Sequence, residues 1–120
     1  MRRGDVVLVS GKGDYGKSRP AVVAQADYFA QHLNSVTVIP FTSDLSSDIS
    51  LRFTIVPSAT NGLRQPSQPM VDKIQTYPRD KVYGPIGLLD AEQMIRIDQA
   101  LIIFLQLAYP AATVPFASKL

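Results

Sequence analysis

Residues 11–23, GKGDYGKSRPAVV, form the stretch of this sequence best suited to chemistry on an anion. Lys12, Lys17 and Arg19 lie in or beside a glycine-rich loop that leads through Pro20 into an apolar segment. Glycines allow the backbone to approach a ligand closely, and the forked donors of a guanidinium match two phosphate oxygens. We therefore interpret the loop as the lip of a binding site for an anionic chain. A hairpin turn carrying solvated basic side chains is the alternative.

The composition restricts the chemistry that the chain can perform. With 120 residues, 46% of them hydrophobic, it suits a single domain over 1–120 with a packed core. The net charge is only +2, so binding to nucleic acid requires a local basic patch. The absence of cysteine and the single histidine, His32, exclude disulfides, zinc–thiolate sites and multi-histidine metal centres. We expect no metal and no cofactor, and a cytoplasmic location.

Two apolar segments raise the question of a membrane. Residues 100–117 are nearly long enough to span a bilayer, but Gln106, Pro110 and Pro115 interrupt them. We favour a buried amphipathic helix here over a membrane span. The N-terminal apolar run, residues 6–9, is too short for a signal peptide. No membrane partner is therefore expected.

The hydrophobic pattern predicts several short strands. The unbroken valine-rich run at 6–9 indicates a strand covered on both faces, whereas residues 51–56 alternate as a half-exposed strand does. Residues 57–69 and most of 76–87 are rich in glycine and proline and are predicted as loops. The predicted strands are residues 6–9, 21–25, 35–41, 51–56 and 70–75, with a short strand at 81–83.

A single long helix is predicted near the end of the chain. Asp90 followed by Gln93 has the pattern of a capping box. Apolar residues such as Met94, Ile97 and Leu101 then recur at helical spacing, so we place the helix at about 91–108. The apolar stripe is wider than one face, which favours packing on the sheet and also on a partner subunit. The fold class is mainly β: a small antiparallel barrel or curled sheet of five to seven strands with a C-terminal helix.

Six segments in order resemble the MazF/PemK-like toxins, the toxic halves of type II toxin–antitoxin pairs: RGDVV, GDYGKSRPAVV, VTVIPFTS, NGLRQPS, VDKIQTYPR and GLLDAEQM. The resemblance covers about residues 2–108, and RGDVV and the G-K-x-RPAVV segment are its most specific parts. It implies an SH3-like barrel with a C-terminal helix, a homodimer and a cognate antitoxin. It also implies sequence-specific, metal-independent cleavage of single-stranded RNA, including mRNA.

The same resemblance implies roles for particular residues. Arg19 matches the arginine of the family's RP motif, and Thr42 matches the threonine that closes the central strand, with Ser43 as a weaker claimant. Asp72 of VDKIQ matches an aspartate that contributes in the PemK-like branch. Arg19, Thr42 and Asp72 are therefore the predicted catalytic residues. That branch also uses a loop histidine six residues before the arginine, where this chain has Gly13, so the general acid or base stays open.

Sequence-specific binding of RNA needs cations, stacking surfaces and base-edge hydrogen bonds. Tyr15 is the predicted stacking residue. A solvated surface is the alternative for any one of these side chains. The predicted RNA-binding residues are Lys12, Tyr15, Lys17, Ser43, Arg52, Arg64, Gln65, Gln68 and Lys73.

Two other classes of function remain open at this point. CcdB-like proteins share the small-barrel fold and poison gyrase through protein binding, but they lack the loop arginine before the proline, so Arg19 argues against them. A non-catalytic RNA-binding module is the second alternative. Cleavage of RNA that depends on Arg19 separates the predicted enzyme from both.

Overall fold

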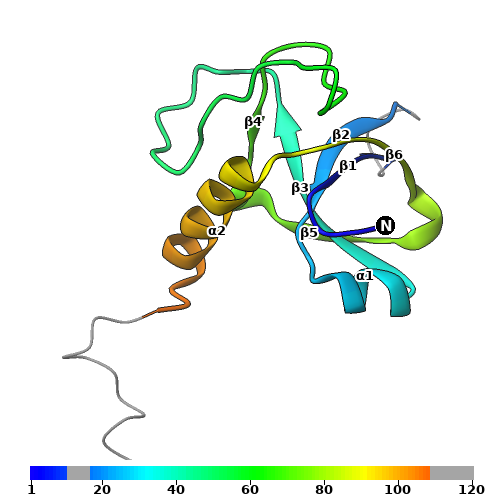
Figure 1. Cartoon of the computed structure of the whole chain (residues 1–120). Coiled ribbons are helices and arrows are strands. Elements are labelled where there is room, and N and C mark those ends of the chain that lie inside the picture. The colour runs from blue at the N-terminus through cyan, green and yellow to red at the C-terminus, as the bar shows by residue number, and fades with distance from the viewer. Residues whose placement is uncertain (11–16, 109–120) are drawn as a thin grey trace, which may run out of the picture.

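The computed structural model describes residues 1–10 and 17–108. These residues form six strands and two α-helices (Figure 1). The helices are α1 (Asp27–His32) and α2 (Ala91–Leu105), and two short 3-10 turns are η1 (Val71–Lys73) and η2 (Arg79–Lys81). The strands are β1 (Asp5–Val9), β2 (Arg19–Val23), β3 (Ser35–Thr42), β4 (Gln68–Pro69), β5 (Gln75–Pro78) and β6 (Val82–Leu88).

All six strands belong to one antiparallel sheet in the order β4-β3-β2-β1-β6, with β5 also paired to β3. The mainly β fold with a C-terminal helix is therefore confirmed. The sheet is not a closed barrel, because β6 pairs with β1 alone among the described strands. Strand β3 is long enough to pair with β4 near one end and with β5 near the other, and η1 lies between these two pairings.

The central strands are buried on both faces. Successive side chains of a strand point to opposite faces, and in β1 Val6 packs in one core cluster while Val7 and Val9 pack in a second. Helix α2 covers the first cluster through residues such as Ile97, and α1 covers the second through Ala30. The prediction that the valine run is covered on both faces is confirmed.

Helix α2 begins as the sequence predicts. The Gln93 backbone N–H donates to the Asp90 carboxylate over 2.7 Å, and the Asp90 N–H donates to the Gln93 amide oxygen over 3.0 Å. The predicted end near 108 is wrong, since the helix stops at Leu105. Gln106 adopts a left-handed conformation with φ 54° and closes the last turn on the carbonyls of Ile102 and Ile103.

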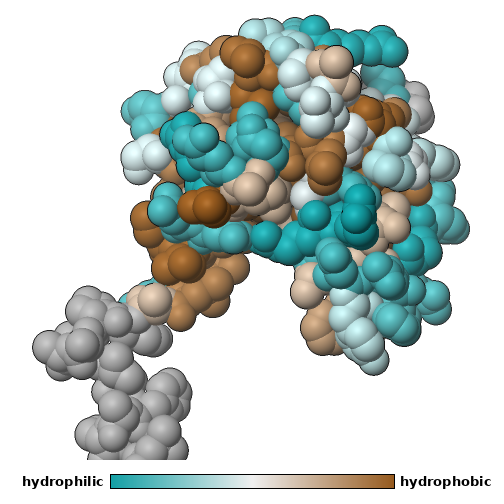
Figure 2. Space-filling model, viewed as in Figure 1, coloured by the Kyte–Doolittle hydropathy of each residue, from teal (hydrophilic) through white to brown (hydrophobic). Residues whose placement is uncertain are grey.

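Only one side of α2 is buried against the sheet, through Ile97, Ala100 and Leu101. Much of the remaining apolar surface is exposed, and Figure 2 shows it as a brown area over the end of the helix. The stripe is thus wider than the sheet alone can bury, as predicted. None of the described helices is long and apolar enough to cross a membrane. The exposed apolar side chains of α2 and the residues after it are Ile95, Ile102, Ile103, Phe104, Leu105 and Leu107.

Three strand predictions are wrong. Residues 51–56 form no strand, although Phe53 and Ile55 are buried as the alternation indicates; only Ile55 pairs, as a single bridge to Ser67. Residues 70–75 contain the 3-10 turn η1, and pairing with β3 resumes only at Gln75. Residues 76–87 are predicted as loop apart from a short strand at 81–83, but the strand β6 extends from Val82 to Leu88. The edge position of β6 tolerates its glycines and its proline because few of its N–H groups need a partner.

Candidate active site

A cavity of about 570 Å³ opens where β2 begins and β3 ends. Ala21 pairs with Pro40, so continuing this register two residues outward brings Arg19 opposite Thr42. Both residues line the cavity. The lining combines the polar residues Ser18, Arg19, Thr42, Ser43, Arg64, Gln65 and Ser67 with Leu8, Pro20, Phe41, Gly62, Leu63 and Ile86.

Arg19 and Thr42 are each held by a paired strand while remaining accessible. Arg19 is exposed, and its backbone is in register with Val9 of β1. The Thr42 hydroxyl oxygen accepts a hydrogen bond of 3.1 Å from the Asp44 backbone N–H. A hydroxyl has one donor besides its acceptor lone pairs, so Thr42 can still donate to a ligand in the cavity.

A turn at residues 58–63 positions the third side of the cavity. The Asn61 side chain is buried: its oxygen accepts from the N–H groups of Ser58 and Leu63, each over 3.0 Å, and its amide donates to the Val56 carbonyl over 2.9 Å. Gly62, at φ 69°, packs directly on β6, where an added Cβ would lie 2.3 Å from the Ile86 carbonyl oxygen. The turn can therefore accommodate only glycine at 62, and it delivers Arg64 and Gln65 to the cavity.

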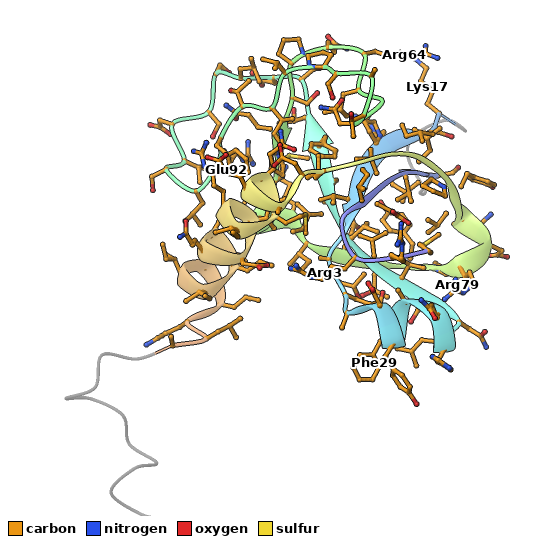
Figure 3. The ribbon with its side chains drawn as sticks, in the orientation of Figure 1. Arg3, Lys17, Phe29, Arg64, Arg79 and Glu92 are labelled. Carbon is orange, nitrogen blue, oxygen red and sulfur yellow. The ribbon has the colours of Figure 1, made fainter. Side chains whose placement is uncertain are left out.

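The charge around the cavity favours an anion. Arg19 and Arg64 line it, and Figure 3 shows Lys17 and Arg64 on the same side of the molecule. The described lining residues include no aspartate, glutamate or histidine. In the part of the chain that the structure describes, no group of three or more potential ligands is arranged to hold a metal ion. Cations that converge on a partly apolar cleft raise the local concentration of a polyanion.

Asp72 lies elsewhere, in an ion pair with Arg52. Two guanidinium nitrogens of Arg52 donate to the two carboxylate oxygens over 3.2 and 3.0 Å, and the side chains are only 8% and 18% exposed. Hydrogen bonding by Arg52 lowers the pKa of Asp72 below its usual value of 3.8. Neither residue lines the cavity. The structure therefore does not bring Asp72 or Arg52 together with Arg19 and Thr42, and it pairs the two with each other.

The other predicted RNA-binding residues divide into four groups. Gln68 is buried, and its amide donates to the Thr54 hydroxyl over 3.1 Å, so it is not presented to an incoming chain. Lys73 is exposed on η1 but does not line the cavity. Lys12 and Tyr15 lie outside the described residues. Ser43, Arg64 and Gln65 line the cavity, and Lys17 is exposed beside it.

Comparisons with known proteins identify the family of this chain. The family described as PemK-like, MazF-like toxin of type II toxin–antitoxin system matches residues 2–105. A relative from Mycolicibacterium smegmatis named probable endoribonuclease MazF is 40% identical over 109 residues, covering 90% of this chain and 99% of the relative. The chain belongs to the MazF-like toxins.

Two solved structures of toxin–antitoxin proteins have the same fold. The Mycobacterium tuberculosis toxin MazF-mt6 superposes with a TM-score of 0.74 at 27% identity, covering 88% of this chain and 99% of that one. An endoribonuclease solved in complex with its cognate antitoxin, from a mycobacterial species, gives a TM-score of 0.71 at 21% identity. Here 92% of this chain and 97% of that one are covered. At this lower identity the likeness concerns the fold.

Some cavity residues of this MazF-like chain were not predicted from the sequence. Ser18, Leu63 and Ile86 were assigned to no site, yet all three line the cavity. Ser18 could have been found as the neighbour of Arg19. The position of Ile86 depends on the pairing of β6 with β1, for which the glycine- and proline-rich sequence gives no local signal.

Proposed function

We propose that this MazF-like toxin is an endoribonuclease that cuts single-stranded RNA, including mRNA, at specific sequences through attack by the RNA's own 2′-hydroxyl. The observation that carries the proposal is the meeting of Arg19 and Thr42 in one cation-lined cavity at adjacent strand ends. The relatives named endoribonucleases support it. Because the nucleophile belongs to the substrate, the protein has mainly to position the RNA and stabilise charge.

The reaction requires proton transfer at the 2′- and 5′-oxygens and stabilisation of the negative charge that develops on the phosphate. The 2′-oxygen loses its proton and bonds to phosphorus, while the bond from phosphorus to the 5′-oxygen breaks and that oxygen gains a proton. The products are a 2′,3′-cyclic phosphate and a 5′-hydroxyl. Arg19 donates to the non-bridging oxygens as their charge grows, and a donor placed in this way is worth about 3–4 kcal/mol. The Thr42 hydroxyl donates a further hydrogen bond to the same phosphate.

Asp72 is a poor base for this reaction. A carboxylate accepts a proton less readily as its pKa falls, and Arg52 lowers the pKa of Asp72. We therefore assign Asp72 a structural role, as the partner of Arg52. Arg19 and Thr42 stabilise the negative charge that develops on the phosphate. Lys17, Ser43, Arg64 and Gln65 bind the RNA around them.

We further propose the partners expected of such a toxin. A second copy of this chain covers the exposed apolar side of α2, which the sheet leaves unburied. A cognate antitoxin, like the one in the mycobacterial complex, inhibits the toxin by placing an acidic, apolar segment on the cavity of Arg19 and Arg64. The activity belongs in the cytoplasm, where the mRNA substrate is found.

The test is to incubate the purified full chain with a long single-stranded RNA in EDTA and to map the product ends. Discrete cuts that leave 2′,3′-cyclic phosphate and 5′-hydroxyl ends are expected. The Arg19→Ala variant, prepared identically, controls for a contaminating nuclease. Products with 3′-hydroxyl ends would contradict the mechanism, and binding without any cutting would favour a non-catalytic RNA-binding module.

A further inference from the structure

Tyr83 of β6 stands at the end of a row of side chains that begins at the cavity. In the sheet register Pro20 of β2 is opposite Leu8 of β1, and Leu8 is opposite Tyr83. Residues directly opposite each other on antiparallel strands project to the same face of the sheet. Because Pro20 and Leu8 line the cavity, Tyr83 lies on the cavity's face of the sheet, one strand further out.

The local shape of β6 keeps this ring accessible. The register of β6 on β1 shifts between Val6 and Leu8, so residues 84–86 lie opposite Val7 alone. Such a bulge bends a strand and redirects its side chains. Ile86, from this bulge, lines the cavity, and Tyr83 is 50% exposed. Since β6 is the edge of the sheet, no described strand continues the row beyond the ring.

We propose that Tyr83 is a base-stacking residue, which holds the base of a nucleotide next to the phosphate bound at Arg19. The inference rests on the proposed function and adds a binding residue to it. Adjacent strands are about 4.8 Å apart, so the backbone of Tyr83 lies about 10 Å from that of Pro20, across two strand spacings. A single-stranded chain that leaves the cavity over Leu8 therefore passes the ring.

The charge of the neighbouring cavity favours RNA as the occupant of this row. Arg19 and Arg64 attract phosphates at one end, while the aromatic ring at the other presents the flat apolar surface on which unpaired bases stack. The aromatic cluster on α1 has no such setting: Tyr28 stacks on His32 at a centroid distance of 4.3 Å. Figure 3 places Phe29 of this cluster on the opposite side of the molecule from Lys17 and Arg64. Tyr28, 64% exposed, is therefore a matched control.

The experiment measures binding and turnover separately. An oligonucleotide containing one mapped cut site, made uncleavable by a 2′-deoxy or 2′-O-methyl nucleotide at the cut, reports Kd by fluorescence anisotropy. Without a mapped site, labelled fragments of the long RNA serve instead. We expect Tyr83→Ala to raise Kd about fivefold to tenfold, with kcat on the cleavable form changed by less than about twofold. Tyr83→Phe, which keeps the ring, and Tyr28→Ala should bind as the wild type does.

Abasic substitutions identify the stacked base. The penalty of Tyr83→Ala should disappear when one particular base beside the cut is removed, because no stacking is then left to lose. An unchanged Kd for a folded Tyr83→Ala protein would overturn the inference and leave the proposed function intact. A wild-type protein that binds but does not cut RNA would overturn the proposed function, while the Kd values would still test the stacking.

Two controls separate stacking from other roles of the ring. If Tyr83→Ala lowers the oligomeric mass measured by light scattering and leaves Kd unchanged, the ring belongs to a protein contact and the inference fails. If Tyr83→Ala does not fold, Tyr83→Leu preserves apolar bulk without the π face. Wild-type affinity in that variant would equally overturn the inference.

Discussion

Arg19 and Arg52 are two arginines of one small sheet protein, and only Arg19 lines the candidate active site. Arg19 is exposed at the start of β2 and lines a cavity whose described residues include no carboxylate. The Arg52 side chain is 8% exposed and donates twice to Asp72. The first side chain lines the cavity in which we propose that RNA binds, whereas the second neutralises a carboxylate of the protein.

The difference shows what decides whether an arginine serves binding or stability. A guanidinium that neutralises a buried carboxylate, as that of Arg52 does, would have to break the pair to hold a phosphate. Removing one member of a buried ion pair leaves the other without its partner, at a cost in stability. We therefore expect substitutions at Arg19 to change catalysis and substitutions at Arg52 or Asp72 to change folding.

The largest expected effect is at Arg19. Arg19→Ala should lower the single-turnover cleavage rate by about 100- to 1000-fold, because it removes the donors aimed at the developing charge. Arg19→Lys should restore only part of the rate, since an ammonium lacks the fork. Arg2→Ala removes the same charge at an exposed position outside the cavity lining and should cleave normally. Equal losses in Arg2→Ala and Arg19→Ala would show that only net charge matters.

The second effect is a loss of stability at the ion pair. Arg52→Ala leaves the Asp72 carboxylate partly buried without its partner and should lower the free energy of unfolding by about 2–3 kcal/mol. At about 4–8 °C per kcal/mol, thermal denaturation should show a fall in Tm of roughly 10 °C. Asp72→Asn should lose less stability and, below its Tm, cleave RNA at nearly the wild-type rate. A Tm that stays unchanged while cleavage is lost in Asp72→Asn would instead return Asp72 to the catalytic residues.

A smaller effect is expected at Asn61, which acts on the cavity through the turn. Asn61→Asp keeps the oxygen that accepts from Ser58 and Leu63 but loses the donor to the Val56 carbonyl. We expect a loss of about 1–2 kcal/mol in stability and a several-fold rise in KM, because Arg64 and Gln65 follow this turn. Steady-state kinetics at a temperature well below Tm separate the rise in KM from the loss of stability. A KM equal to that of the wild type would show that the loop is positioned without Asn61.

The smallest effect is the pH dependence of the ion pair. The pKa of Asp72 lies below its usual 3.8 in the folded protein, so the pair stabilises the fold fully at pH values above 3.8. As the pH falls through the lowered folded pKa, the carboxylate takes up a proton and that stabilisation is lost. The difference in unfolding free energy between the wild type and Asp72→Asn should therefore be constant from about pH 7 to 5 and shrink below about pH 4. A difference that grows in acid would have the wrong sign for this account.

The elements predicted correctly are those with local signals. The start of α2 follows from Asp90 and Gln93, whose hydrogen bonds span three residues. The burial of Phe53 and Ile55 follows from alternation, but the absence of a strand there does not, since pairing depends on a distant partner. Only the start of β6 is predicted, as the short strand at 81–83, for the same reason: the rest of its sequence favours a loop, and its pairing with β1 makes it a strand.

The candidate site was predicted in part. Arg19 and Thr42 were named from the family resemblance, and the structure places both in one cavity. Lys73 is adjacent to Asp72 in the sequence, but Arg52, twenty residues away, forms the ion pair with Asp72. The row that ends at Tyr83 joins three strands and depends on their register, which a single sequence does not reveal.

The most direct test of the central claim removes the 2′-oxygen from one nucleotide of the substrate. An oligonucleotide with a single mapped site is made with a 2′-deoxy nucleotide immediately before the cut, and both binding and cleavage are measured in EDTA. If the cavity of Arg19 and Thr42 only assists attack by the RNA's own oxygen, the deoxy substrate should bind with an unchanged Kd and show no cleavage. Cutting of the deoxy substrate at the same position would contradict the account.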